Sequence, residues 1–460
     1  MTLLSKFVPA TMPIFWVLTA FLAIVFLTGG GSRPDVQSLI ILRPLSVVVC
    51  GIALFSLHSA HVRAYRTLFV LAAAACALVL AHLIPLPPEI WQLLPGRELM
   101  ITVDRAADIG AHWRPIALVP ALAWNAFYSL FVPLAVLLLA VQLRSEERYN
   151  LLKVVLGLGL FSGVWGLFQV LGSSDGPLYL YRYTTNGAAV GLFANRNHQA
   201  VLLSALFPML AVFASMGVRT VLNKWLALGF AAFLIPLILV TGSRAGIFTA
   251  LVALPLAFFL YRKPAPAAPL KRTSKQPFNP APLLIGLGVL SLAVVTVVLS
   301  RAEAFRRLLT LDQNDELRWQ IWGPIADMAM KYFPLGSGIG SFVQVYQIDE
   351  PDRLLGLTYV NRAHNDWLEI WLTAGVPGAI LLAVLVGGFL MASYAAFARP
   401  ANSSRSIIYA RVGAAILFIF GLASVVDYPL RTPSLACVAV LAIIWLCGEP
   451  GKHVEKAGGV

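Results

Sequence analysis

A histidine and a glutamate stand close together where the longest polar stretch of the chain gives way to an apolar one. His364 and Glu369 lie in the segment 362–378. An imidazole takes and gives a proton near neutral pH without a metal ion, so His364 could serve as a general base for a hydroxyl group. The alternative at such a boundary is an amphipathic interfacial residue, and the spacing alone does not choose between them.

The carboxylate of Glu369 follows His364 by five positions, which is about 140° around a straight helix. It therefore need not touch the imidazole. It could hold sugar hydroxyls of an acceptor or pair with an arginine. Asn365 stands between the two, in the same motif.

A second polar group precedes an apolar run and consists of Asn195, Arg196, Asn197 and His198. Asparagine is a favourable helix N-cap, which accounts for part of this polarity. The remainder exceeds what capping requires, so we treat these residues as candidates for a ligand site.

Two arginines are placed where they could bind an anion. Arg244 lies between two apolar runs, beside a predicted helix N-terminus whose free N–H groups already favour negative charge. Arg318 precedes Trp322 by four residues, so both should share one helix face. A guanidinium group can bind two phosphate oxygens at once through two N–H groups in one plane. The alternative interpretation is that each arginine extends toward lipid headgroups. A tryptophan here could be a sugar platform or an interfacial anchor.

The elements that must position these residues are membrane helices. The 460 residues are 59% hydrophobic and 12% charged, and the mean hydropathy is +0.80. A soluble chain carries about 25% charged residues, so a soluble protein is excluded. Unbroken apolar runs of about 20 residues indicate helices, because barrel strands would alternate. We predict an all-α polytopic membrane protein of about twelve spans, at roughly 14–28, 38–57, 67–84, 125–143, 150–171, 199–217, 225–240, 245–261, 283–299, 376–397, 407–426 and 432–447.

Charge predicts how these spans are oriented. With both termini inside, the inner segments hold 18 basic and 4 acidic residues, and the outer segments hold 15 basic and 17 acidic residues. Arg43, inside a predicted span, supplies the remaining positive charge. Positive residues favour the cytoplasmic side, so the net charge of +13 reports topology and is no indication of nucleic acid binding. The first run has no small-residue cleavage site after it, and we interpret it as an uncleaved signal anchor.

This layout divides the chain into four parts. Residues 1–299 hold nine spans and an amphipathic outer segment, 85–124, which we expect to form a helix lying in the interface. Residues 300–365 form a large outer loop that is partly helical. Residues 366–447 hold the last three spans, and 448–460 form a cytoplasmic tail.

Neither a metal nor a nucleotide is expected as a cofactor. The four cysteines lie in apolar runs and show no metal spacing. The glycines at 336, 338 and 340 lack a surrounding strand–helix nucleotide unit, so we predict a turn at the end of the outer loop.

Several motifs together resemble the O-antigen ligase and O-antigen (exopolysaccharide) polymerase family, which are membrane glycosyltransferases of the GT-C type. The motifs occur in family order and on the expected side of the membrane, and they are Asn195-Arg196-Asn197-His198-Gln199-Ala200, Gly242-Ser243-Arg244-Ala245-Gly246, Arg318-x-x-x-Trp322, Gly336-x-Gly338-x-Gly340-x-Phe342 and His364-Asn365-x-x-Leu368-Glu369. The likeness covers about 120–430, and the first 120 residues match only in layout.

The resemblance implies a metal-independent reaction at the periplasmic leaflet of a bacterial inner membrane. A glycan on undecaprenyl pyrophosphate, the lipid-linked oligosaccharide donor, would pass to a hydroxyl of a glycan or of lipid A-core. His364 matches the family's catalytic histidine, and Arg244 and Arg318 match its pyrophosphate-binding arginines. We add Arg196 and His198 from their position, with Asn195, Asn365 and Glu369 in supporting or acceptor-binding roles.

Three readings stay open. A ligase would use lipid A-core as acceptor, and a polymerase would use another lipid-linked repeat unit. A polyprenyl-linked glycan transporter or flippase without catalysis is the alternative from another class, and such proteins tend to contain internal repeats. We find no obvious repeat. The sugar, the stereochemical outcome and the oligomeric state are not encoded in any pattern that we recognise.

Overall fold

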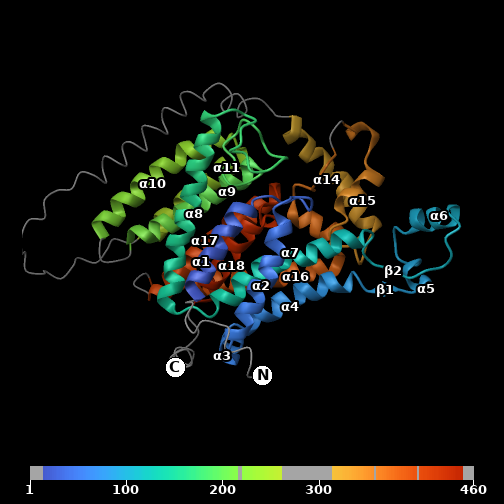
Figure 1. The fold of residues 1–460 in the computed structure, drawn as a ribbon, viewed down its shortest axis with the longest axis horizontal. Helices are drawn as coiled ribbons and strands as arrows, with labels where there is room; N and C mark the ends of the chain where they lie inside the picture. Colours follow the sequence, from blue (N-terminus) through green and yellow to red (C-terminus); the bar gives the residue numbers. More distant parts are fainter. Residues whose placement is uncertain (1–13, 216–219, 262–312, 357–358, 401–403, 449–460) are drawn as a thin grey trace, which may run out of the picture.

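The computed structural model describes residues 14–215, 220–261, 313–356, 359–400 and 404–448. Within these ranges the chain is mostly helical, and the only strands are two short ones (Figure 1). Eleven of the twelve predicted apolar runs coincide with helices, namely α1 (Ile14–Thr28), α2 (Leu39–Ser56), α4 (Arg66–Ala81), α7 (Pro120–Ala140), α8 (Ser145–Leu171), α9 (Arg196–Ser215), α10 (Thr220–Thr241), α11 (Arg244–Leu260), α16 (Asp366–Phe397), α17 (Arg405–Val426) and α18 (Pro433–Cys447). The predicted span 283–299 lies outside the described residues.

Seven of the described helices are long and apolar enough to cross a membrane, and four more are apolar but shorter. The protein is therefore a helical multi-pass membrane protein. The total of twelve spans stays a prediction.

The core is organised around α9, which is buried along almost its whole length by α8, α10, α11 and α17. Close approach of the helices depends on small residues, as expected where apolar lipid supplies little drive for helix association. A Cβ atom added to Gly246 would lie 2.2 Å from the Cβ atom of Ala200. The first turn of α11 is thus pressed against the first turn of α9, which brings Arg244 and Arg196 to the same end of the bundle.

A second hydrophobic cluster lies in the described part of the predicted outer loop. It is formed by α14 (Gln313–Lys331), α15 (Phe342–Asp349) and the residues that lead into α16. A 3₁₀ turn, η2 (Asp352–Leu354), follows α15. This loop is partly helical, as the sequence predicts, and its own core fixes it against α16.

The segment 85–124 differs from the single interfacial helix predicted for it. It contains a strand pair, β1 (Pro85–Leu86) with β2 (Arg114–Pro115), and two short helices, α5 (Pro88–Trp91) and α6 (Glu98–Ala106), which project from the bundle before α7 begins (Figure 1). Proline lacks a backbone N–H group, and Gly96 has a positive φ of 74°, so a continuous helix cannot form. A further short helix, α3 (Ser59–Ala64), links α2 to α4.

A break in α16 sets the direction of its first turns. Gly375 has φ 56° and ψ −148°, outside the helical region. The carbonyl groups of Leu372 and Thr373 accept hydrogen bonds from the N–H groups of Ser337 and Gly338, at 3.0 and 2.9 Å. The N–H groups of the glycine-rich turn after α14 therefore bind the carbonyl groups that the break leaves without helical partners. The break divides α16 into the first turns, which lead from the outer loop, and the apolar stretch predicted at 376–397.

Candidate active site

A buried carboxylate lies at the centre of the polar residues. Asp427 directly follows α17, and its side chain is fully buried. Its Oδ1 atom lies 3.7 Å from Nδ1 of His364 and 3.8 Å from Nε2 of His198. These are ion-pair distances, longer than hydrogen bonds. Asn197 donates a hydrogen bond of 2.6 Å from Nδ2 to Oδ2 of Asp427.

The surroundings of Asp427 keep it charged. Burial alone raises the pKa of this carboxyl group, but the two neighbouring imidazoles and the positive charge of Arg318 outweigh burial and hold the pKa well below its usual range. Asp427 is thus an anion at neutral pH. An anion beside two imidazoles stabilises either ring when that ring takes up a proton.

The ring of Tyr428 contacts both imidazoles. Its ring centroid lies 5.0 Å from that of His364 and 5.1 Å from that of His198. Burial raises the pKa of Tyr428 to about 12, so the phenol stays neutral. The His364 side chain is 18% exposed and that of His198 only 1%. Of the two, His364 is therefore the ring that a substrate can reach.

A hydrogen-bonded chain connects this centre to the N-terminus of α11. Ser243 caps α11 by accepting a hydrogen bond of 2.9 Å from the N–H group of Gly246. Its hydroxyl group donates one of 2.7 Å to Oδ1 of Asn197, which in turn holds Asp427. Arg244 is the first residue of α11. The backbone of Arg244 is thus held near Asp427 through the side chains of Ser243 and Asn197.

The other predicted arginines approach from two further helices. Arg196 is the first residue of α9, next to Asn197, and Asn195 accepts a hydrogen bond of 2.8 Å from the Asn197 N–H group in the capping role expected of it. Arg318 lies on α14, and its charge acts on both Asp427 and Tyr428. The structure therefore places Arg318 near the same centre.

Trp322 connects α14 to the residues 361–365 before α16, which we name the histidine loop. Its indole Nε1 donates a hydrogen bond of 3.1 Å to the carbonyl group of Ala363, the residue before His364. His364 itself has a φ of 49°, which a non-glycine residue adopts only when the surrounding structure holds it there. The loop is thus held at Ala363, directly before the histidine.

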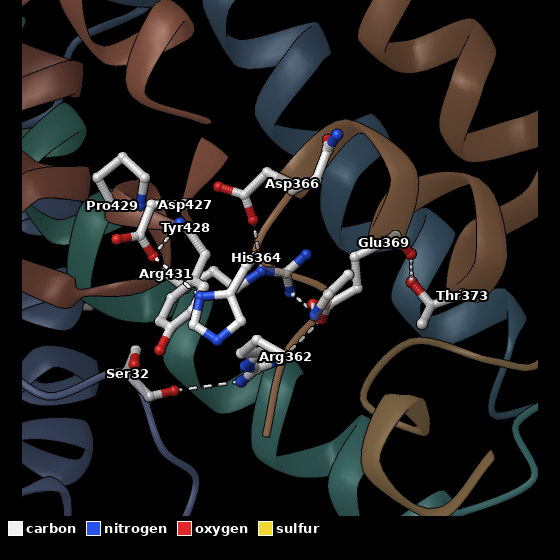
Figure 2. Close-up of polar contacts among 12 residues, drawn as sticks. Ser32, Arg362, His364, Asp366, Glu369, Thr373, Asp427, Tyr428, Pro429 and Arg431 are labelled. Carbon is white, nitrogen blue, oxygen red and sulfur yellow. Dashed lines mark hydrogen bonds and ion pairs between the residues drawn. The ribbon is translucent and has the colours of Figure 1, made fainter. Parts of the chain in front are cut away.

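Glu369 and Asp366 form a cluster with two arginines at the start of α16 (Figure 2). Glu369 Oε1 lies 2.9 Å from Nη1 of Arg362 and 3.1 Å from Nη1 of Arg431, while Arg431 Nε donates a hydrogen bond of 2.6 Å to Asp366. The Ala363 N–H group donates to Oε2 of Glu369 at 3.1 Å. Two guanidinium groups thus share two carboxyl groups, and both oxygens of Glu369 are used.

Two predicted roles are refined by this geometry. Glu369 was expected either to hold acceptor hydroxyls or to pair with an arginine, and the structure supports the pairing, because its side chain is 2% exposed. Asn365 is the N-cap of α16, and its Oδ1 accepts a hydrogen bond of 3.1 Å from the Leu368 N–H group. Both residues therefore shape the loop that presents His364.

Asp427 is the main residue that the sequence reasoning missed. A signal for it was present, because an acidic residue directly after a long apolar run, on the same predicted side as His364, is a candidate functional group. Ser243 stood inside a recognised motif, but only the folded chain shows that its hydroxyl group reaches Asn197.

Within the part of the chain that the structure describes, no group of three or more His, Cys, Asp or Glu side chains is arranged to hold a metal ion. The charged groups near His364 are instead two guanidinium groups that share the carboxyl groups of Asp366 and Glu369, and the carboxylate of Asp427.

The fold and the site define a multi-pass membrane protein with a polar centre assembled from the ends of α9, α11, α16 and α17. Residues 229–383 match the family model described as O-antigen ligase, and this confirms the resemblance indicated by the motifs. The match includes Arg244, Arg318 and His364, and it ends before Asp427. It supports a glycosyltransferase-type enzyme that uses a lipid-linked glycan donor and a glycan acceptor. A search of curated proteins found no match.

Proposed function

We propose that the protein is a metal-independent glycosyltransferase of the O-antigen ligase or polymerase kind. It would transfer a glycan from undecaprenyl pyrophosphate to an acceptor hydroxyl at the periplasmic face of a bacterial inner membrane. The observation that carries this proposal is the position of Asp427, 3.7 Å from Nδ1 of His364 and within the field of Arg318.

In this proposal His364 is the general base. Nδ1 faces the Asp427 carboxylate, which leaves Nε2 as the atom to accept the proton of the attacking hydroxyl group. As the hydroxyl oxygen bonds to the anomeric carbon, the bond from that carbon to the pyrophosphate oxygen breaks. The proton then resides on His364, and the anionic Asp427 stabilises the imidazolium.

The arginines would neutralise the leaving pyrophosphate. Arg244 stands at a helix N-terminus, where backbone N–H groups add to its charge, and Arg196 begins the neighbouring helix α9. Arg318 approaches from α14. Guanidinium groups can bind two phosphate oxygens at once, and in this role they would replace a divalent cation.

The proposed location follows from topology. The sequence-based orientation puts the N-termini of α9, α11 and α16 and the C-terminus of α17 on the outer side. The four ends meet in one place in the structure, as a common side of the membrane requires.

A reconstitution separates the candidate activities. Purified protein is supplied with lipid-linked repeat units, with and without lipid A-core, and glycan length is followed on gels. Chain growth without the core indicates a polymerase, and transfer only to the core indicates a ligase. Movement of lipid-linked glycan across a vesicle membrane with no new glycosidic bond would reject the proposal in favour of a transporter.

A further inference from the structure

Two exposed tyrosine rings flank one arginine beside the site. The Cζ atom of Arg33 lies 4.3 Å from the ring centroid of Tyr183 and 5.5 Å from that of Tyr359. The two tyrosines are 53% and 44% exposed. Arg33 also makes a two-pronged ion pair with Asp35, at 2.9 and 2.8 Å. With Arg182, whose Cζ lies 5.4 Å from the Tyr183 ring, we name these five residues the tyrosine platform.

The platform is built from three loops that are far apart in the sequence. Arg33 and Asp35 follow α1, Tyr183 lies between α8 and α9, and Tyr359 precedes the histidine loop. The first two loops are fastened to each other, because the Gly30 N–H group donates a hydrogen bond of 2.7 Å to the buried Tyr181 hydroxyl group. Exposed rings on fixed loops can bind a ligand with little loss of conformational entropy.

The platform is also tied to the candidate active site. The carbonyl group of Ser32, next to Arg33, accepts a hydrogen bond of 3.1 Å from Nη2 of Arg362 (Figure 2). Arg362 in turn binds Glu369, which accepts a hydrogen bond from the backbone just before His364. A ligand on the platform would therefore lie beside the histidine loop.

The chemistry of the platform suits a sugar ring. The face of a tyrosine ring is negative and accepts the weakly positive C–H groups on one face of a pyranose. Arg33 covers part of both rings, and the exposed remainder of each tyrosine is the surface offered to the sugar. The hydroxyl groups at the sugar edge need donors and acceptors nearby, which Arg182, Arg33 and Asp35 supply. A tyrosine that only anchors the protein at the lipid interface needs neither the Arg33–Asp35 ion pair nor the link to the histidine loop.

We propose that the tyrosine platform binds a sugar of the glycan other than the one at the reacting carbon. This inference rests on the proposed function for the identity of its ligand. It makes Tyr183 and Tyr359 specificity residues that select a glycan longer than one sugar.

The test measures binding before transfer. The purified full-length protein in detergent is titrated with undecaprenyl pyrophosphate that carries either one hexose or a linear tetrasaccharide of hexoses. We expect the wild type to bind the tetrasaccharide form about tenfold more tightly, which corresponds to about 1.4 kcal/mol. The double variant Tyr183→Ala, Tyr359→Ala should bind both forms alike, and Tyr183→Phe, Tyr359→Phe should keep the preference because the rings remain.

The matched control removes two other exposed tyrosines, Tyr128 on α7 and Tyr394 on α16, which are 45% and 78% exposed. That variant should behave as the wild type. If the Tyr183→Ala, Tyr359→Ala variant weakens binding of both lipids equally, the tyrosines are general anchors and the inference is wrong. An unchanged preference for the tetrasaccharide in that variant would overturn it as well.

A second arm identifies the source of the sugar. Free tetrasaccharide and free hexose are titrated against protein saturated with the one-hexose lipid. A tyrosine-dependent preference here assigns the platform to the acceptor glycan, and a preference only among the lipid-linked forms assigns it to the donor. If the wild type shows the preference but transfers no glycan under any condition, the proposed function fails while the binding site stands.

Discussion

Nδ1 of His364 lies 3.7 Å from Oδ1 of Asp427, although two membrane helices, α16 and α17, separate them in the chain. His364 is partly exposed, whereas the Asp427 side chain is fully buried. A buried anion behind a reachable imidazole orients the ring and stabilises its protonated form. In catalytic triads of hydrolases a carboxylate holds a histidine in this way, though here the nucleophile would come from the substrate.

We expect Asp427→Asn to lower the rate of glycan transfer by about 100-fold or more, because the charge that stabilises the protonated His364 is lost while the shape is kept. The measurement is transfer from lipid-linked donor by purified protein, with donor binding followed separately. Donor affinity should change little. A variant that transfers at the wild-type rate would remove Asp427 from the mechanism.

The two histidines beside Asp427 should differ in effect. His364→Ala should abolish transfer while expression and donor binding persist, because the general base is gone. His198→Gln should retain measurable transfer, because that side chain is only 1% exposed and cannot reach a hydroxyl group of a substrate. Parallel assays of both variants test this, and equal loss in the two would contradict our assignment of the base.

Replacing Arg244 tests whether transfer needs a group that binds two phosphate oxygens at once or only a positive charge. We predict that Arg244→Lys and Arg244→Ala both reduce transfer, because an ammonium group cannot bind two phosphate oxygens in one plane. Inhibition by added pyrophosphate should weaken in the same variants. Lys153→Arg, a change on α8 that keeps the charge, serves as a control. Full activity of Arg244→Lys would show that charge alone suffices.

The ion cluster at the start of α16 should matter for folding. Glu369→Ala leaves Arg362 and Arg431 with a single carboxylate between them, and breaking a buried ion pair in this way costs roughly 3–5 kcal/mol. The melting temperature in detergent should fall by several degrees. Glu98→Ala, at an exposed position, should leave it nearly unchanged. A stable Glu369→Ala protein that is merely inactive would argue for direct contact with substrate.

Acid should destabilise the contact between the end of α4 and the glycine-rich turn. His82 is buried, its Nδ1 accepts a hydrogen bond of 3.3 Å from the Ile339 N–H group, and burial, with the charge of Arg97, lowers the pKa of His82 to about 4. The unfolded ring binds a proton below about pH 6.5. Between these values the unfolded state holds more protons, so stability falls as pH decreases, by roughly 3 kcal/mol in total.

The variant His82→Asn keeps an acceptor near Nδ1 without the titrating ring. Its melting temperature should change less than that of the wild type between pH 7.5 and pH 5. The same loss of stability in both proteins would exclude His82 as the cause.

The amino-acid sequence by itself determined the class of protein and most of the helices. Unbroken apolar runs must become helices in a bilayer, since no other local structure satisfies their backbone groups there. The sequence also marked His364, Arg244 and Arg318, because charged and titratable groups stand out where an apolar run begins or a loop intervenes. It overpredicted a continuous helix at 85–124, where prolines and Gly96 divide the chain into short elements.

Only the tertiary structure decided how these groups meet. The link from Ser243 through Asn197 to Asp427 joins three segments whose separation in the chain carries no distance information. The pairing of Glu369 with Arg362 and Arg431, rather than with a ligand, depends on burial that arises when α16 packs beside the turn after α17. Periodicity and composition report which face of a helix is apolar. The depression of the Asp427 pKa comes from neighbours brought together by packing, and local sequence does not encode it.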